Sequence, residues 1–234
     1  MTHDGLAALD ARLAGQESKR WDDFYANRAR PVPFFPGLPD ENLAEWLANG
    51  TIGAGGRALD LGCGNGRNAI CLARHGFRVD GVDYSETALA WARERAREAG
   101  AEVDFRCASV FDAALEPGAY GFVYDSGCFH HIAPHRRQQY IALAARTLKP
   151  GGWFGMTCFR PEGGSGYTDD EVYERNSLGG GLGYTEQHLR DHWASACDVR
   201  LVRQMKEQPA DSAFFGKDFL WVLLARKPAE GASA

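Results

Sequence analysis

The sequence lacks three features that are typical of membrane proteins, of secreted proteins, and of proteins stabilised by zinc or disulfides. No apolar run approaches the roughly 20 residues needed to span a bilayer. Residues 1–5 have neither the basic nor the apolar region of a signal peptide. The six cysteines include no C-x-x-C pair, which argues against a zinc site and a disulfide framework. These absences predict a cytoplasmic protein with reduced, buried thiols and no membrane contact.

Clustered positive charge and metal-ligand spacing are also missing. The formal net charge is −5, and lysine and arginine are scattered rather than gathered among aromatic residues. Because nucleic-acid-binding proteins usually present a basic surface to phosphate, no nucleic-acid partner is expected. His130, His131 and His135 do not form an H-E-x-x-H motif, so no metal is expected either. The remaining expectation is a monomer or homodimer that acts on a small molecule.

What the sequence does contain is a regular alternation of strands and helices. Strands are predicted at 57–61, 79–83, 103–107, 121–124 and 153–159. Helices are predicted from about 65 to 75, after Ser85 to Gly100, and from Pro134 onward. Two more strands, about 199–205 and 219–224, have the spacing of an antiparallel pair. The expected fold is α/β, a Rossmann-like doubly wound seven-stranded sheet that is mostly parallel with an antiparallel edge strand.

Two segments lie outside this alternation. Residues 1–50 are expected to form an N-terminal helical cap, because Leu6, Leu9 and Leu13 have helical spacing. Residues 51–228 would be the main domain, with a glycine-rich insertion at about 160–184 acting as a lid. Residues 229–234 are expected to be a disordered tail.

A glycine-rich run follows the first predicted strand, with Gly62, Gly64 and Gly66 in the sequence D-L-G-C-G-N-G. Glycine allows the backbone to turn tightly and to approach a ligand closely. The dinucleotide fingerprint G-x-G-x-x-G needs its third glycine one residue later, where Arg67 stands. The spacing therefore disfavours a nicotinamide-dependent oxidoreductase, which remains an alternative.

Asp83 closes the second predicted strand, about 20 residues beyond the glycines, where nucleoside-binding α/β folds place an acid that accepts hydrogen bonds from ribose. Taken alone, an aspartate at a strand end also serves as a turn former. The glycine run, Asp83 and the segments 108–110 and 125–127 all follow strands. They are therefore expected to meet at the carboxyl edge of the sheet.

The run from Ala58 to Gly66, Asp83 and the turn from Leu148 to Gly152 resemble the class I S-adenosylmethionine-dependent methyltransferases. The resemblance implies S-adenosylmethionine as cofactor, with the glycine loop facing its methionine end. One departure is Ser109, since family members often have an acid at that position. The cofactor-binding residues that the resemblance implies are Asp60, Gly62, Gly64, Gly66, Asp83 at ribose, Tyr84, Ser109 and Val110 at adenine, and Asp125 near the methionyl amine.

The segment containing Trp21 and Tyr25 is similar to the N-terminus of small thiopurine and tellurite-resistance methyltransferases, where aromatic residues close over the cofactor. Aromatic residues in such an extension also serve as plain hydrophobic anchors. The resemblance adds Trp21 and Tyr25 to the expected cofactor-binding residues.

The candidates for chemistry follow the fourth predicted strand. Phe129 is expected to form a wall of the acceptor pocket, and His130 and His131 are candidate bases or packed residues. The resemblance implies in-line methyl transfer to a small soluble acceptor, in which alignment is expected to outweigh proton transfer. The acceptor atom stays open among oxygen, nitrogen, sulfur and halide. A non-catalytic S-adenosylmethionine-binding module is the second alternative.

Overall fold

The structure, a computed structural model, describes residues 18–229. Leu6, Leu9 and Leu13, on which the expected helical spacing rested, lie outside the described residues. The expected disordered tail also lies outside them, apart from residue 229.

One seven-stranded sheet forms the centre of the domain, with the strand order β3-β2-β1-β4-β5-β7-β6. The pairs from β3 to β5 are parallel, whereas β7 runs antiparallel to both β5 and β6. The predicted mixed sheet is confirmed, and the antiparallel strand β7 lies one place inside the edge, which β6 occupies. The strands are β1 Arg57–Leu61, β2 Arg78–Asp83, β3 Val103–Cys107, β4 Tyr120–Ser126, β5 Leu148–Phe159, β6 Asp198–Gln204 and β7 Leu220–Arg226.

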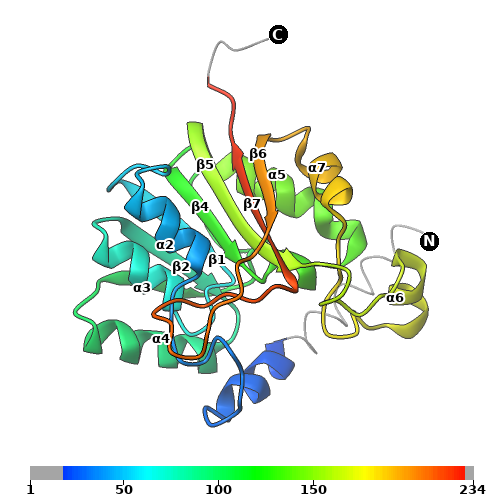
Figure 1. Cartoon of the computed structure of the whole chain (residues 1–234), viewed down its shortest axis with the longest axis horizontal. Coiled ribbons are helices and arrows are strands. Elements are labelled where there is room, and N and C mark those ends of the chain that lie inside the picture. Colours follow the sequence, from blue (N-terminus) through cyan, green and yellow to red (C-terminus); the bar gives the residue numbers. More distant parts are fainter. Residues whose placement is uncertain (1–17, 230–234) are drawn as a thin grey trace.

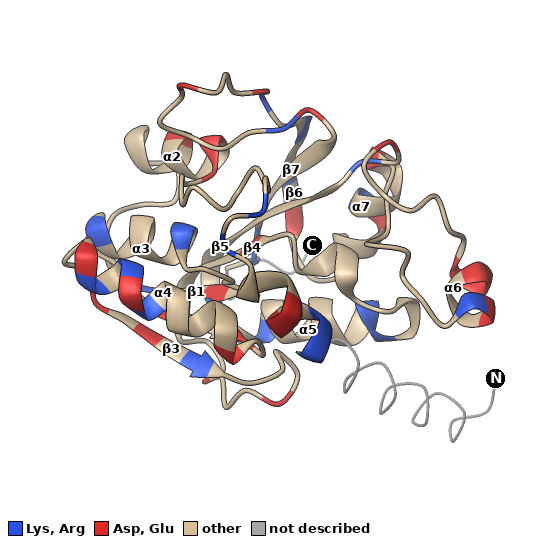
Figure 2. Cartoon of the chain, turned by 90° about the horizontal axis from the view of Figure 1, so that it is seen from below, with Lys and Arg blue, Asp and Glu red and all other residues tan. Residues whose placement is uncertain are grey.

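Helices cover both faces of the sheet, as Figure 1 shows. One face carries α2 (Glu41–Ala48), α3 (Arg67–Arg74) and α4 (Glu86–Glu98), and the other carries α5 (Arg137–Thr147) and α7 (Glu186–Trp193). Each face has its own buried hydrophobic cluster. In Figure 2, acidic and basic residues are interspersed along the described helices and strands. No helix among residues 18–229 is both long enough and apolar enough to cross a membrane.

The helix starts follow local chemistry. The Ser85 side chain accepts a hydrogen bond from the amide of Ala88 and begins α4, as predicted. Helix α3 begins at Arg67 rather than at residue 65, because Gly66 has a left-handed φ of 79° that only glycine adopts easily. Pro134 opens a short 3-10 turn, η2 (Pro134–Arg136), before α5 begins.

The N-terminal segment divides into two parts with different roles. Residues 18–26 are helical and lie at the bottom of Figure 1. There Asp22 accepts hydrogen bonds from the Ser85 hydroxyl at 2.7 Å and the Thr87 amide at 3.1 Å. Helix α2 instead packs on the sheet, where Trp46 contacts Tyr124 with ring centroids 6.4 Å apart. The first part therefore contacts the start of α4, whereas α2 contacts the sheet.

The glycine-rich segment 160–184 is packed against the domain. Its helix α6 (Asp169–Arg175) is tied to α5 by a bidentate ion pair between Arg137 and Asp169, with both contacts at 2.8 Å. Beyond α6, Leu178 and Tyr184 are buried in the core cluster. The amide of Leu182 donates to the carbonyl oxygen of His130 at 2.8 Å. This segment therefore contacts the turn after β4.

Candidate active site

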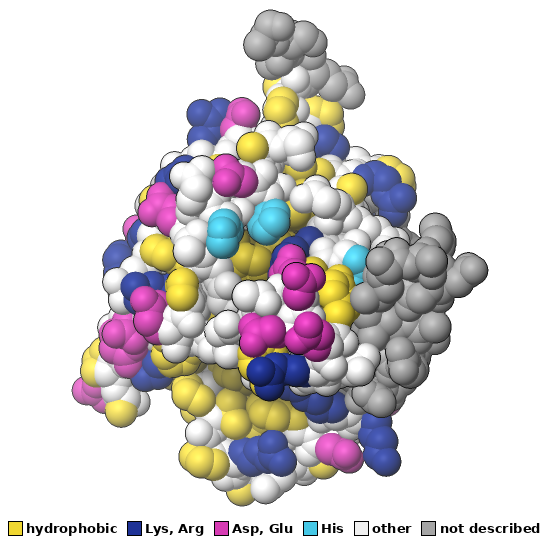
Figure 3. Space-filling view, turned by 90° about the vertical axis from the view of Figure 1, so that its right-hand side faces the viewer, with side chains coloured by type: hydrophobic (Ala, Val, Ile, Leu, Met, Phe, Trp, Pro, Cys, Tyr) yellow, Lys and Arg dark blue, Asp and Glu magenta, His cyan; other side chains and the backbone are white. Residues whose placement is uncertain are grey.

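A cavity of about 560 Å³ runs along the carboxyl edge of the sheet. The ends of β1 and β2 and the residues after β3 line one half, and the ends of β4 and β5 and the start of β7 line the other. The strand order reverses between β1 and β4, and open α/β sheets bind ligands at such a switch point. Figure 3 shows hydrophobic side chains gathered in a hollow on the lower part of the face drawn there.

Asp83 lies at the end of β2 and lines the first half of the cavity. One carboxylate oxygen accepts a hydrogen bond from the amide of Gly64 at 2.9 Å, and the other accepts one from the amide of Ser85, also at 2.9 Å. Burial raises the pKa of Asp83 above its ordinary value. Since a carboxylate accepts about four hydrogen bonds, each oxygen keeps acceptor capacity for a hydroxyl.

The glycine loop combines left-handed backbone with close packing. Gly62 has a φ of 67°, and a Cβ atom built there would lie 2.7 Å from Cβ of Cys128. A Cβ atom on Gly64 would lie 2.5 Å from the hydroxyl of Tyr25. Gly62 and Gly64 line the cavity, whereas Gly66 does not and packs against Ala92 instead. The expected ligand contact of Gly66 is therefore corrected: this glycine allows α3 to approach α4.

Asp60 sits beneath the loop at the cavity wall with 1% of its surface exposed. Its Oδ2 atom has no hydrogen-bond partner among residues 18–229, and burial raises the pKa of this carboxyl well above its ordinary value. A buried polar atom of this kind normally has a partner, so the site calls for a donor from a bound molecule. The ammonium group of S-adenosylmethionine fits that requirement.

The remaining cofactor candidates surround the same half. Tyr84, Ser109 and Val110 line the cavity beyond β2 and β3. Trp21 and Tyr25 line it from the N-terminal helix, and Tyr25 stacks on Phe35 with ring centroids 5.6 Å apart. The structure thus brings these residues together around one cavity.

Comparison with known proteins agrees with this geometry. A family profile described as "Methyltransferase domain" matches residues 58–152, which contain the glycine loop, Asp83 and the turn after β4. In sequence over this region and in fold, the chain resembles the class I S-adenosylmethionine-dependent methyltransferases.

Proteins similar to this chain include a ubiquinone biosynthesis O-methyltransferase from Thiobacillus denitrificans, which is 38% identical over 109 residues, 46% of each protein. This chain thus spans about half the length of the curated relatives it matches. The 1,6-didemethyltoxoflavin-N1-methyltransferase of Burkholderia thailandensis has a similar fold, with a TM-score of 0.64, 21% identity and coverage of 97% of this chain and 91% of that one. TehB from Haemophilus influenzae also has a similar fold, with a TM-score of 0.58 and 18% identity. The match covers 79% of this chain and 62% of that one.

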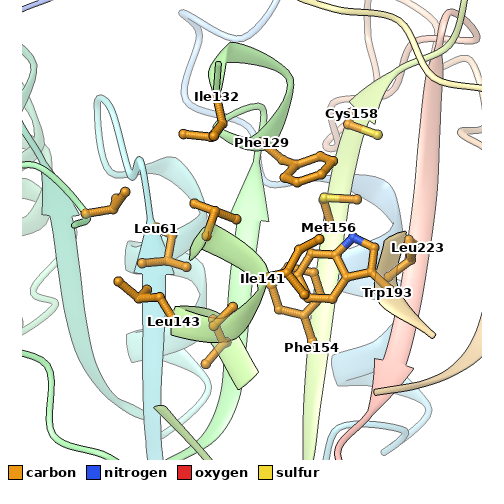
Figure 4. Packing of buried hydrophobic residues seen from close by; sticks show 14 of the residues in the cluster. Leu61, Phe129, Ile132, Ile141, Leu143, Phe154, Met156, Cys158, Trp193 and Leu223 are labelled. Atoms are coloured by element: carbon orange, nitrogen blue, oxygen red, sulfur yellow. The ribbon is translucent and has the colours of Figure 1, made fainter. Parts of the chain in front are cut away.

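Phe129 does not occupy the position that the sequence suggested for it. Its ring is fully buried and contacts Tyr184 and Trp193, with centroids 5.1 and 6.0 Å away, and it does not line the cavity. Figure 4 shows the ring within the core near Met156 and Cys158. The expected pocket wall is corrected, because the 3-10 turn η1 (Phe129–His131) points this ring inward and the two histidines outward.

Asp125 is also absent from the cavity wall. Its carboxylate accepts hydrogen bonds from the amides of Cys128 at 2.7 Å and Phe129 at 2.9 Å and from the hydroxyl of Tyr140. Burial raises the pKa of Asp125 to about 7. The expected contact with the methionyl amine is therefore corrected, since Asp125 fixes the turn that carries His130.

Several lining residues were missed by the sequence analysis. Arg67 faces the second half of the cavity and stacks over the ring of Phe215 at 4.6 Å. Phe159, Phe219 and Leu220 complete the apolar wall there. The position of Arg67 directly after the glycine run was the available signal, but its neighbours in space are distant in sequence. Among residues 18–229, no three His, Cys, Asp or Glu side chains group as metal ligands.

The stability of the protein is expected to depend on pH through His131. Burial, with Arg20 nearby, lowers the pKa of His131 to about 3. Because an unfolded histidine titrates near 6.5, the unfolded state binds the extra proton between about pH 6.5 and 3, and stability falls as pH falls. Between pH 7.5 and 5, the free energy of unfolding measured in urea should therefore fall by about 1–2 kcal/mol less in His131→Phe than in wild type. His188→Phe, at an exposed site, is the control, and equal losses in all three proteins would contradict the assignment.

Proposed function

We propose that this protein transfers a methyl group from S-adenosylmethionine to a small soluble molecule. Asp83, with its two amide partners and spare acceptor capacity, is the observation that carries the proposal. Asp83 would hold the ribose, and Asp60, Gly62 and Gly64 would hold the methionine end. When bound, S-adenosylmethionine supplies a methyl group that moves by in-line displacement, its carbon–sulfur bond breaking as the bond to the acceptor forms. The protein's part is alignment, which can be worth about 7–11 kcal/mol.

The two halves of the cavity support separate sites for the cofactor and for the methyl acceptor. The half at β4, β5 and β7 adjoins the cofactor half and would hold the acceptor. Two of the similar proteins are named as a ubiquinone biosynthesis O-methyltransferase and a 1,6-didemethyltoxoflavin-N1-methyltransferase, and these names support a small-molecule acceptor. We further propose that the protein is cytoplasmic, is a monomer or homodimer, and uses no nucleic-acid or membrane partner. Residues 18–35 and the segment 160–184 would cover the bound molecules.

Calorimetric titration tests the cofactor. We expect S-adenosylhomocysteine to bind with a defined stoichiometry and NAD to give no heat of binding. Methyl transfer across a panel of phenols, amines, thiols and heteroaromatic compounds then separates an enzyme from a non-catalytic binding module. Binding of NAD in place of S-adenosylhomocysteine would favour the oxidoreductase alternative.

A further inference from the structure

His130 lies in the half of the cavity formed at β4, β5 and β7, and its ring is held on several sides. It lines the cavity with only 4% of its surface exposed. The imidazole stacks on the ring of Phe159, with centroids 3.8 Å apart and planes 3° from parallel. A Cβ atom on Gly181 would lie 3.1 Å from its Cδ2 atom, so the glycine-rich segment closes in beside the ring. The ring therefore has a fixed orientation.

The hydrogen bonding of this ring determines which nitrogen carries the proton. The backbone amide of Phe159 donates to Nδ1 of His130 at 3.1 Å. Because an amide nitrogen can only donate, Nδ1 presents a lone pair and the proton of the neutral ring is on Nε2. Burial lowers the pKa of His130 well below its ordinary value, so the ring takes up no second proton near neutrality. Among residues 18–229, no other group hydrogen-bonds to this imidazole.

Further donors and aromatic rings occupy the same half of the cavity. The guanidinium of Arg67 donates to the Ser126 hydroxyl at 2.7 Å, and that hydroxyl lies 3.1 Å from the hydroxyl of Thr157. All three residues line the cavity, together with the rings of Phe159, Phe215 and Phe219. The wall thus combines flat apolar surface with groups that donate hydrogen bonds. Such a wall suits an aromatic molecule with oxygen lone pairs.

We propose that His130 is a fixed hydrogen-bond donor to the methyl acceptor, and that the acceptor is an aromatic molecule whose oxyanion faces Nε2–H. The proposal rests on the proposed function, because it assigns the acceptor half of the same cavity. Hydrogen bonds to an ionised acceptor are about twice as strong as those between neutral groups, so a phenolate binds better than its phenol. His130 is not a general base, because the Phe159 amide occupies Nδ1 and Nε2 already carries a proton.

The first test reads the histidine directly and needs neither cofactor nor acceptor. Nitrogen NMR of the full chain with 15N-labelled histidine distinguishes the two neutral forms and the imidazolium. We expect His130 to keep the Nε2–H form from about pH 5.5 to 8, its signals being assigned by their loss in His130→Gln. An Nδ1–H form, or an imidazolium within this range, would overturn the proposal.

The second test uses 4-nitrophenol, whose phenol and phenolate absorb at different wavelengths, on protein loaded with S-adenosylhomocysteine. We expect the bound probe to ionise at lower pH than the free probe. His130→Gln, whose amide can donate near the Nε2 position, should keep most of this shift, whereas His130→Phe should lose it and bind the phenolate about tenfold or more weakly. His130→Asn, with a shorter amide, replaces His130→Phe if that variant does not fold.

The outcomes separate this proposal from the one it rests on. If calorimetry shows no binding of S-adenosylhomocysteine, the proposed function fails, while NMR still reports the state of His130. If S-adenosylhomocysteine binds but wild type does not bind 4-nitrophenol, or binds its phenol and phenolate forms equally, the proposed aromatic oxyanion acceptor is wrong. Unchanged probe binding in His130→Phe, with His188→Gln as the matched exposed control, would also overturn the role of His130.

Discussion

Asp83→Ala is expected to weaken the binding of S-adenosylhomocysteine about 10- to 150-fold, the equivalent of 1.5–3 kcal/mol for hydrogen bonds to a charged group. Asp83 is the carboxylate at the end of β2, and its oxygens already organise the amides of Gly64 and Ser85. Its removal would therefore cost the contact with ribose and also loosen the glycine loop. Isothermal titration calorimetry of the folded variant measures the change.

The matched control for Asp83 is Asp23→Ala, because Asp23 is an exposed carboxylate on the N-terminal helix. Asp23→Ala should bind S-adenosylhomocysteine with the affinity of wild type. Asp83→Asn adds a second comparison, since an amide oxygen still accepts one hydrogen bond and should restore part of the binding. Wild-type affinity in folded Asp83→Ala would place the ribose elsewhere and contradict the site.

Arg67→Met should lower the free energy of unfolding by about 3–5 kcal/mol, the range for breaking a buried ion pair on one side. Arg67 pairs with Asp40 at 2.5 Å, and Asp40 has no exposed surface. Asp40 also accepts hydrogen bonds from Tyr124 at 2.7 Å and Asn68 at 3.1 Å. Without Arg67, a buried carboxylate loses its positive partner. Chemical denaturation at neutral pH measures the loss.

An exposed ion pair on β6 provides the control for Arg67. Arg200 and Asp198 lie 3.1 Å apart with more than half of each side chain exposed, so Arg200→Met should cost less than about 1 kcal/mol. The double variant Asp40→Asn with Arg67→Met should recover part of the stability, because it leaves no uncompensated charge. A loss below about 1 kcal/mol in Arg67→Met alone would contradict the buried-pair assignment.

Structural features that depend on residues close together in the sequence were predictable. The glycine loop, Asp83 and the cap at Ser85 each depend on residues within one turn or one strand end, and each has the expected position relative to its strand or helix. The antiparallel pairing of the last two strands also followed from their spacing. What could not be inferred was that β7 separates β6 from β5.

Contacts between distant residues were not predictable. Phe129 and His130 are neighbours in sequence, yet a 3-10 turn sends one ring into the core and the other to the cavity. No periodicity reveals such a turn in three residues. The partner of Arg67 lies 27 residues earlier, and Phe215 lies far later in the chain. Without these partners, Arg67 was visible only as an interruption of the dinucleotide spacing.

The two halves of the cavity differ in how they can change over evolution. The strand-end part of the cofactor half lies between Asp60 and Val110, a continuous stretch of chain that also carries Arg67 of the other half. The acceptor half comes from separate places, including Ser126 to His130, Thr157 to Phe159 and Phe215 to Leu220. Under the proposed function, substitutions there would alter which molecule is methylated while leaving the methyl donor's site intact. A family with this layout can acquire new substrates without first rebuilding its use of the cofactor.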